Sequence, residues 1–142
     1  MRNPLFDICC ERNSDPVEQR DRIVKILQTG VDINATDKNG VTALHHAVRF
    51  RSPIAVKTLI EHGANVNQAC SKSGSTPLHR AFTQTGAPGT AGKAEQAKEI
   101  IRILLAAGAS PFIRNKSGKR PAAYIKHPAV KSVLRTSRTV RK

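Results

Sequence analysis

The chain has 142 residues, of which 39% are hydrophobic and only 4% aromatic, and it has no Trp. This composition fits one compact domain or a few stacked repeats of thin helices packed through Ala, Leu, Ile and Val. No apolar run approaches the ~20 residues that cross a bilayer, and no uninterrupted apolar segment follows Arg2, which argues against a secretory signal peptide. The three cysteines include no CxxC pair, which argues against a disulfide framework or a thiolate metal site. We expect them to be small buried thiols in a reducing compartment.

The net charge of +14 is unevenly placed along the chain. Every Asp and Glu lies at or before Glu99, whereas eleven basic residues follow it, from Arg102 to Lys142. A positive field concentrated in one half attracts anionic partners and speeds their encounter, but it does not identify them.

The first third of the chain predicts a helical hairpin. Residues 4–12 favour a short first helix, and Asp15 can cap a second helix that has Pro16 at its first position. Residues 17–29 place apolar side chains on one helical face, and Gly30 provides the left-handed stop.

The next segment predicts an arm, a turn and two helices. Residues 31–36 form the extended arm, and the turn after it needs Gly40 for its positive φ. Thr42 is expected to cap one helix. Ser52 and Pro53 then begin the helix over 54–62, which ends at Gly63.

The same order of elements returns further along the chain. Glycines that end helices recur from position 30 to position 63, a period of 33 residues, and the following unit, up to Gly108, is longer because it holds an inserted loop at 85–93. A helix is predicted over 94–107, ending at Gly108. The final unit keeps the turn at 115–118 and predicts a short second helix over 128–135.

This period, together with a turn and a Thr-Pro-Leu-His box, resembles the ankyrin repeat. The third unit carries the box at Thr76, Pro77, Leu78 and His79, and the second carries it with Ala43 in place of Pro. The resemblance implies an all-α ankyrin-repeat solenoid of about four stacked helix–turn–helix units in one domain. The expected units are 1–34 (N-terminal cap), 35–67, 68–112 with the insertion 85–93, and 113–136 (C-terminal cap), followed by a basic tail, 137–142.

No arrangement of residues argues for an enzyme, a cofactor or a metal site. His45 and His79 occupy the same repeat position, where the resemblance implies a structural role with the imidazole bonded to backbone and to Thr42 or Thr76. The chain has no HExxH, no nucleophile elbow and no Walker-type phosphate loop. Asn34 and Asn67 are expected to bond within the repeat turns, and such asparagines can also be hydroxylated in ankyrin-like proteins.

The resemblance also implies a concave partner-binding face made of turn tips and the exposed side of each first helix. Carried over residue by residue, it selects Thr36, Lys38, Asn39, Val41, Arg49, Phe50, Lys72, Ser73, Ser75, Thr83, Gln84, Arg114, Lys116, Ser117 and Lys119. Most charges in this set are positive. Phe50 is either an exposed anchor for a partner or part of the core of a neighbouring repeat.

These features favour a non-catalytic, monomeric, intracellular scaffold, cytoplasmic or nuclear, that binds an acidic protein through its basic concave face. One alternative is a nucleic-acid or anionic-surface binder that uses the basic C-terminal half, although few aromatics are available to stack on bases. Another is the N-terminal ankyrin module of a larger bacterial or viral effector delivered into a host cell. The basic tail leaves a nucleic-acid or import patch, a membrane contact, a secretion signal and simple disorder open.

Overall fold

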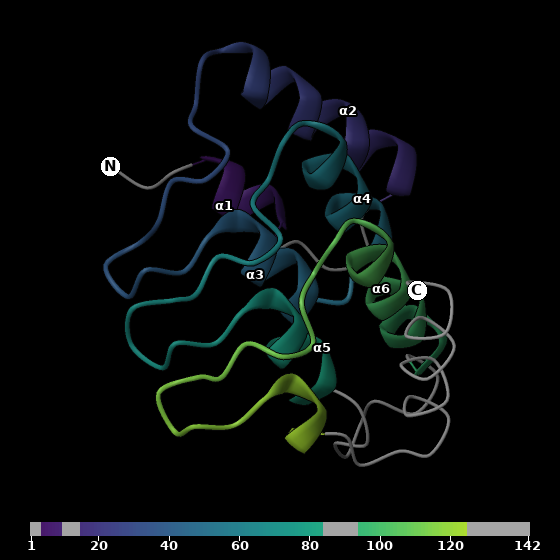
Figure 1. Cartoon of the computed structure of the whole chain (residues 1–142). Helices are drawn as coiled ribbons and strands as arrows, with labels where there is room; N and C mark the ends of the chain where they lie inside the picture. The colour runs from purple at the N-terminus through teal and green to yellow at the C-terminus, as the bar shows by residue number, and fades with distance from the viewer. Residues whose placement is uncertain (1–3, 10–14, 84–93, 125–142) are drawn as a thin grey trace.

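A computed structural model describes residues 4–9, 15–83 and 94–124 (Figure 1). The predicted insertion 85–93, the predicted second helix 128–135 and the tail 137–142 lie outside the described residues. So do Cys10 and Gln84.

The described residues form helices joined by loops, without a strand among them. The helices are α1 (Pro4–Cys9), α2 (Pro16–Gln28), α3 (Ala43–Arg49), α4 (Pro53–Glu61), α5 (Pro77–Thr83), α6 (Ala94–Ala106) and the 3-10 helix η1 (Pro121–Tyr124). One isolated antiparallel bridge joins Thr36 and Thr42. The predicted all-α class is confirmed, and the caps at Asp15, Thr42 and Ser52 lie where the sequence placed them.

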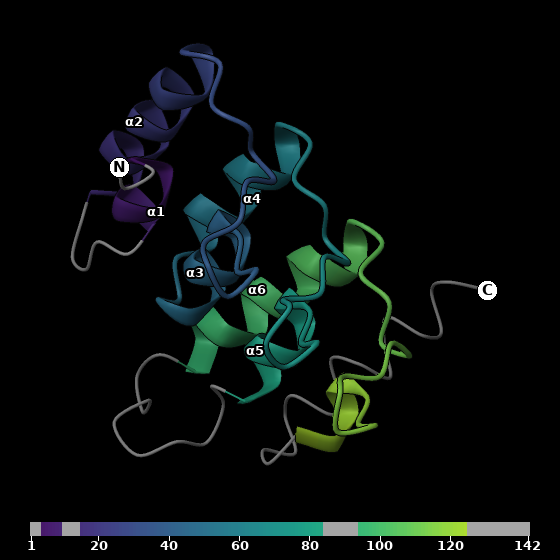
Figure 2. The same cartoon turned by 90° about the vertical axis from the view of Figure 1, so that its left-hand side faces the viewer.

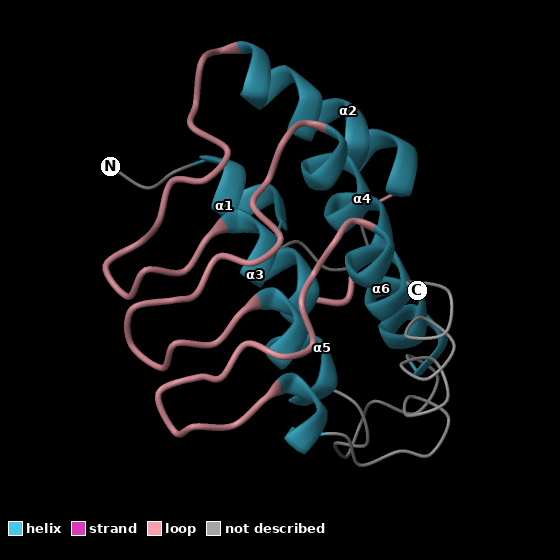
Figure 3. Ribbon diagram, viewed as in Figure 1, coloured by secondary structure: helices cyan, strands magenta, loops and turns pink. Residues whose placement is uncertain are grey.

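The helices stack in two layers (Figures 1 and 3). An inner row holds α1, α3, α5 and η1, and an outer row holds α2, α4 and α6. Three loops project from the inner row to one side, and Figure 2 views the molecule from that side. We call these loops the first, second and third fingers, residues 37–41, 70–75 and 115–119.

Small and branched side chains build the core between the two rows. Ala43, Ala47 and Ala55 are fully buried, so neighbouring helices can approach closely around Leu44 and Leu59. Cys9 and Cys70 are buried free thiols, as the composition predicted.

Two glycines allow adjacent fingers to touch. Gly40 has φ +74° and Gly74 has φ +72°, a region that side chains with a Cβ rarely adopt. A Cβ on Gly40 would lie 2.5 Å from the backbone nitrogen of Ser71, and one on Gly74 would lie 2.9 Å from that of Lys116. Glycine at these two positions therefore supplies both the turn and the close contact with the next finger.

The finger contact predicts different costs for two chemically identical substitutions. Gly40→Ala and Gly118→Ala place alanine at nearly the same φ, +74° and +75°, but only Gly40 has a neighbour within 4 Å. Gly118→Ala should lower the free energy of unfolding by about 1–2 kcal/mol, the cost of left-handed alanine, and Gly40→Ala should lower it by clearly more. Urea denaturation of both variants measures the difference, and equal losses would contradict a tight finger contact.

Candidate partner-binding surface

His45 joins its own helix to the next finger. Its Nδ1 accepts from the Thr42 amide at 3.2 Å and lies 2.8 Å from Thr42 Oγ1, forming a capping box at the start of α3. Its Nε2 lies 3.0 Å from the carbonyl oxygen of Ser75 at the base of the second finger. The structural role predicted for His45 is therefore confirmed.

His79 repeats this arrangement one unit further on. Its Nδ1 lies 3.1 Å from the Thr76 amide nitrogen, and its Nε2 lies 2.9 Å from the carbonyl oxygen of Lys119 in the third finger. Each histidine thus holds one finger relative to the preceding inner helix.

Both histidines bond as neutral rings. A carbonyl can only accept, so Nε2 carries the proton, and Nδ1 must then accept from the backbone amide. Burial lowers the pKa of His45 to about 4, against a smaller opposing effect of the Ser75 carbonyl. Burial also lowers the pKa of His79. The links between units are therefore made by uncharged imidazoles at neutral pH.

Backbone hydrogen bonds connect the finger tips directly. The Asn39 carbonyl accepts from the amides of Ser71 at 3.0 Å and Lys72 at 3.3 Å. The Ser73 carbonyl accepts from the Lys116 amide at 2.9 Å. We call the tips joined in this way the finger row.

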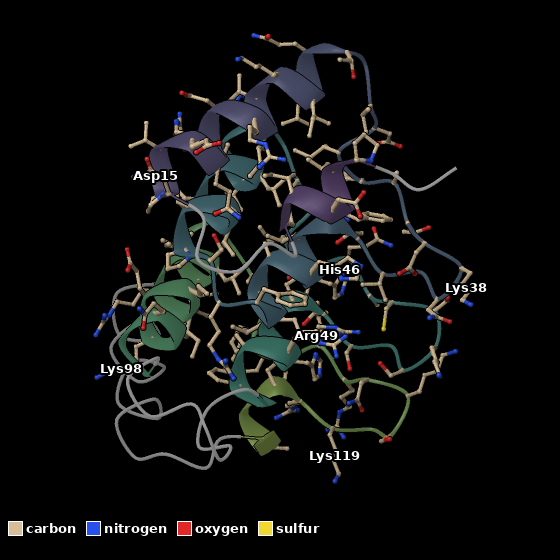
Figure 4. The ribbon with its side chains drawn as sticks, turned by 180° about the vertical axis from the view of Figure 1, so that it is seen from behind. Asp15, Lys38, His46, Arg49, Lys98 and Lys119 are labelled. Atoms are coloured by element: carbon tan, nitrogen blue, oxygen red, sulfur yellow. The ribbon has the colours of Figure 1, made fainter. Side chains whose placement is uncertain are left out.

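Most predicted partner-binding residues are accessible on the fingers and on α3. Exposed positions are Thr36, Lys38, Arg49, Lys72, Ser73, Arg114, Lys116, Ser117 and Lys119, and the half-buried ones are Asn39, Phe50 and Ser75. Thr83 ends α5, and its side chain is not described. In Figure 4, Lys38, Arg49 and Lys119 lie on the side of the fingers and inner helices, whereas Asp15 and Lys98 lie on the opposite side.

Val41 was predicted to face a partner, and this prediction is wrong. The residue is only 6% exposed. Its carbonyl accepts from the Asp37 amide and its amide donates to the Asp37 carboxylate, which closes the base of the first finger. Val41 also lies immediately before Thr42, the N-cap of α3.

His46, on α3, is half buried. Its ring packs against Phe6 of α1 with centroids 5.2 Å apart, and its Nε2 lies 3.5 Å from a carboxylate oxygen of Asp37. Burial lowers the pKa of His46 even though Asp37 opposes the shift. Burial raises the pKa of Asp37, but the amides of Val41 and Asn39, with His46, outweigh this and lower it. The His46 ring is therefore covered by α1, a contact that the sequence around His46 does not reveal.

The side chains of Asn34 and Asn67 bond between units rather than within their own turns. The Asn65 amide donates to Asn34 Oδ1 and the Ser110 amide donates to Asn67 Oδ1, both at 2.8 Å. The loops that follow α2, α4 and α6 stack at the repeat spacing, so each asparagine side chain reaches the following loop.

One exposed aromatic was missed in the sequence. Phe112 is 55% exposed, and the Arg120 guanidinium carbon lies 5.9 Å from its ring centroid. Phe112 occupies the repeat position of Asn34 and Asn67, and this departure from the pattern was the available signal. Phe50 is half buried, with the Arg49 guanidinium carbon 5.9 Å from its ring.

Cys70 lies at the base of the second finger, beside basic and hydroxyl groups. Its sulfur is 3.0 Å from Ser73 Oγ. Burial raises the pKa of this thiol, but hydrogen bonds from Ser73, Ser75 and Arg80 outweigh burial and bring it to about 7.

The exposed acidic residues lie mainly away from the fingers. Four acidic residues, Glu18, Asp21, Glu61 and Glu99, are exposed on the outer helices. Asp37 is the one acid among residues 37–41, 70–75 and 115–119, and its carboxylate already binds the amides of Asn39 and Val41. The described fingers therefore present mainly lysine to an approaching molecule.

Comparisons with known proteins agree with this architecture. A family model for ankyrin repeats (3 copies) matches residues 8–115. This chain belongs to the ankyrin-repeat family. It is similar to the crystal structure of the ankyrin repeat domain of Bcl-3, with a TM-score of 0.69, 31% identity, and coverage of 84% of this chain and 47% of that one.

Two curated relatives show how widely the repeats occur. The B-cell lymphoma 3 protein homolog of Mus musculus is 32% identical over 82% of this chain and 23% of its own length. Glycerophosphocholine phosphodiesterase gde1 of Schizosaccharomyces pombe is 33% identical over 81% of this chain but only 9% of its own length. The chain thus spans less than a quarter of either relative, and the match to the phosphodiesterase covers a small part of that enzyme.

Metal-binding clusters and membrane-spanning helices are absent from the part of the chain that the structure describes. Residues 4–9, 15–83 and 94–124 contain no group of three His, Cys, Asp or Glu that could hold a metal ion. Across the same ranges, no helix has the length and apolar character needed to span a membrane.

The buried neutral histidines predict a loss of stability in mild acid. Between pH 6.5 and about 4 the unfolded chain binds a proton that folded His45 does not, so the stability present above pH 6.5 falls as the pH is lowered through this window. A shift of this size corresponds to roughly 3 kcal/mol when the window is crossed completely. Urea denaturation between pH 7.5 and 4.5 measures it.

Two variants isolate the contribution of His45. His45→Gln should be less stable than the parent at pH 7.5 but should lose less further stability on acidification. Gln28→Ala, at the exposed end of α2, is a control that leaves every titratable group in place and should keep the parental slope. An unchanged slope in His45→Gln would contradict the assignment.

Proposed function

We propose that this chain is a non-catalytic scaffold that binds the acidic surface of another protein through a basic concave face. Ankyrin repeats are in general protein–protein interaction modules, and the proposal specifies the face and the charge of the partner. One observation carries it: the exposed lysines Lys38, Lys72 and Lys116 recur once per finger, and the exposed acids lie mainly on the outer helices.

The rigidity of this face supports the proposal. The fingers are held by His45 and His79 and by backbone hydrogen bonds between the tips, so little conformational entropy remains to be lost there on binding. Electrostatic complementarity of this kind favours fast encounter and rejects basic partners.

We further propose that the chain acts as a monomer in a reducing compartment, the cytoplasm or nucleus. The free thiols of Cys9 and Cys70 support this setting. The small share of each relative that the chain spans is compatible with an ankyrin module of a larger protein, including an effector.

Charge reversal on the fingers tests the proposal. The triple variant Lys38→Glu, Lys72→Glu and Lys116→Glu should weaken binding of the partner protein at least about tenfold, or ~1.4 kcal/mol. The control Lys25→Glu, Lys57→Glu and Arg102→Glu makes the same change in net charge on exposed positions of the outer helices and should leave binding nearly unchanged. Circular dichroism should show the same helical content in both.

The partner is obtained by affinity capture and mass spectrometry, repeated after nuclease treatment. Equal loss of binding in the two triple variants would overturn the assignment of the finger face. Loss of the captured proteins after nuclease treatment would favour the nucleic-acid alternative. In that case affinity should fall with salt by a log–log slope of about −0.9 per duplex phosphate neutralised.

A further inference from the structure

Two positions just after the glycine of the third finger carry exposed cations. The residue two places after the finger glycine is a buried cap in the first two units, Thr42 and Thr76, at 2% and 1% exposed. In the third unit the same position holds the exposed Arg120. The residue one place after the glycine is the buried Val41 in the first unit and the exposed Lys119 in the third. The stacked scaffold itself requires neither charge.

An exposed aromatic ring lies beside these cations. Phe112 is 55% exposed and takes the position at which Asn34 and Asn67 accept hydrogen bonds from the following loop. The Arg120 guanidinium carbon lies 5.9 Å from the centre of the Phe112 ring. The ring therefore has a cation beside it and about half of its surface open to solvent.

The hydrogen bonds of the third finger bring a further arginine to the same place. The Asn115 amide donates to the Lys119 carbonyl at 2.9 Å, so the two arms of the finger run antiparallel and the flanking Arg114 and Arg120 are neighbours. Nη1 of Arg114 also donates to the Gly118 carbonyl at 3.4 Å, which holds the guanidinium against the finger and leaves its charge intact. We call this group of side chains the end patch: Phe112, Arg114, Lys119 and Arg120.

The end patch lies on the one finger that no further finger covers among the described residues. A Cβ on Gly40 or Gly74 would meet the next finger, whereas a Cβ on Gly118 would meet nothing within 4 Å. The third finger and η1 form the lower end of the inner row in Figure 1. Residues 112–120 also include no Asp or Glu. The patch thus combines an aromatic ring with cations that no acid of the same segment neutralises.

A ring among cations matches the chemistry of single-stranded nucleic acid. Unpaired bases expose flat faces that stack on an aromatic side chain, and the phosphates between them pair with Arg and Lys. A base in a duplex keeps its faces within the base stack, where the Phe112 ring does not reach them. An acidic peptide would satisfy the cations but has no need of the ring.

We propose that the end patch binds single-stranded nucleic acid, with one base stacked on Phe112 and the neighbouring phosphates held by Arg114, Lys119 and Arg120. This inference goes beyond the proposed function, because it gives the end of the stack a ligand of a different class. Phe112 and Arg120 do not belong to the face assigned to the acidic protein, so their variants test this ligand separately.

A tryptophan at position 112 reports stacking directly. The chain has no Trp, so Phe112→Trp places a single indole at the proposed stacking position. A short oligothymidylate should quench its fluorescence, whereas an oligoglutamate of equal charge should not, because only a base can stack on the indole. Phe50→Trp, beside Arg49 at the end of α3, is the matched control and should show no quenching by either ligand.

Affinity measurements separate the ring from the charges. By anisotropy of a fluorescein-labelled oligothymidylate with the full chain, Phe112→Leu, which keeps an apolar side chain without the ring, should weaken binding at least about fivefold. Phe50→Leu should leave the affinity as in the parent. A duplex of the same length should bind at least about fivefold more weakly than the single strand. An oligouridylate in the same assay determines whether RNA or DNA is the preferred strand.

Salt dependence counts the phosphates that the patch holds. At about −0.7 per phosphate of a single strand, three contacts give a log–log slope of about −2, and Arg120→Gln should reduce it to about −1.4. The same change in net charge at Arg102→Gln, on α6, should leave the slope nearly as in the parent.

Three results would overturn the inference. Equal affinities of the parent and Phe112→Leu for oligothymidylate would show that the ring takes no part. Binding of the duplex as tightly as the single strand would reject base stacking. Tighter binding of the oligoglutamate, without quenching of Phe112→Trp by oligothymidylate, would assign the patch to an acidic protein segment. Capture of the protein partner with the triple lysine variants tests the proposed function independently of all three.

Discussion

The hydrogen bonds that run from each unit to the next are the constraint on which this structure depends. Each unit is too thin to bury its own apolar face, so stability has to come from stacking on neighbours. The Nε2 atoms of His45 and His79 reach the carbonyls of Ser75 and Lys119 in the following fingers. The side chains of Asn34 and Asn67 accept hydrogen bonds from backbone amides in the next loop, and so join the loops that follow α2, α4 and α6. These polar links fix the register that an apolar core of Ala, Leu and Ile leaves less strictly defined.

The same links position the surface that we assign to partner binding. A lysine on an isolated turn would sample many positions, because its long side chain and its loop are both flexible. In the stack, the imidazole of the preceding unit holds the base of the second and third fingers, and backbone hydrogen bonds hold the tips. Features that stabilise the scaffold therefore also arrange its charges, at the cost of requiring glycine at positions 40 and 74.

Neutral histidines make the scaffold sensitive to acid while leaving it intact at neutral pH. His45 is fully buried and accepts a hydrogen bond from the Thr42 amide at Nδ1, so a second ring proton would break this bond and place a charge in the core.

Sequence alone determined the period and the caps, because these depend on local spacing and turn chemistry. Its resemblance to the ankyrin repeat implied the class of fold and the structural role of His45 and His79. The sequence did not determine which residues the neighbouring units would cover. Val41 is buried because the first finger closes on it, and His46 is half buried because α1 packs against its ring. The contacts of Asn34 and Asn67 also reach the following loop, which no single repeat contains. Burial and register in a solenoid arise between units, and only the stacked structure could decide them.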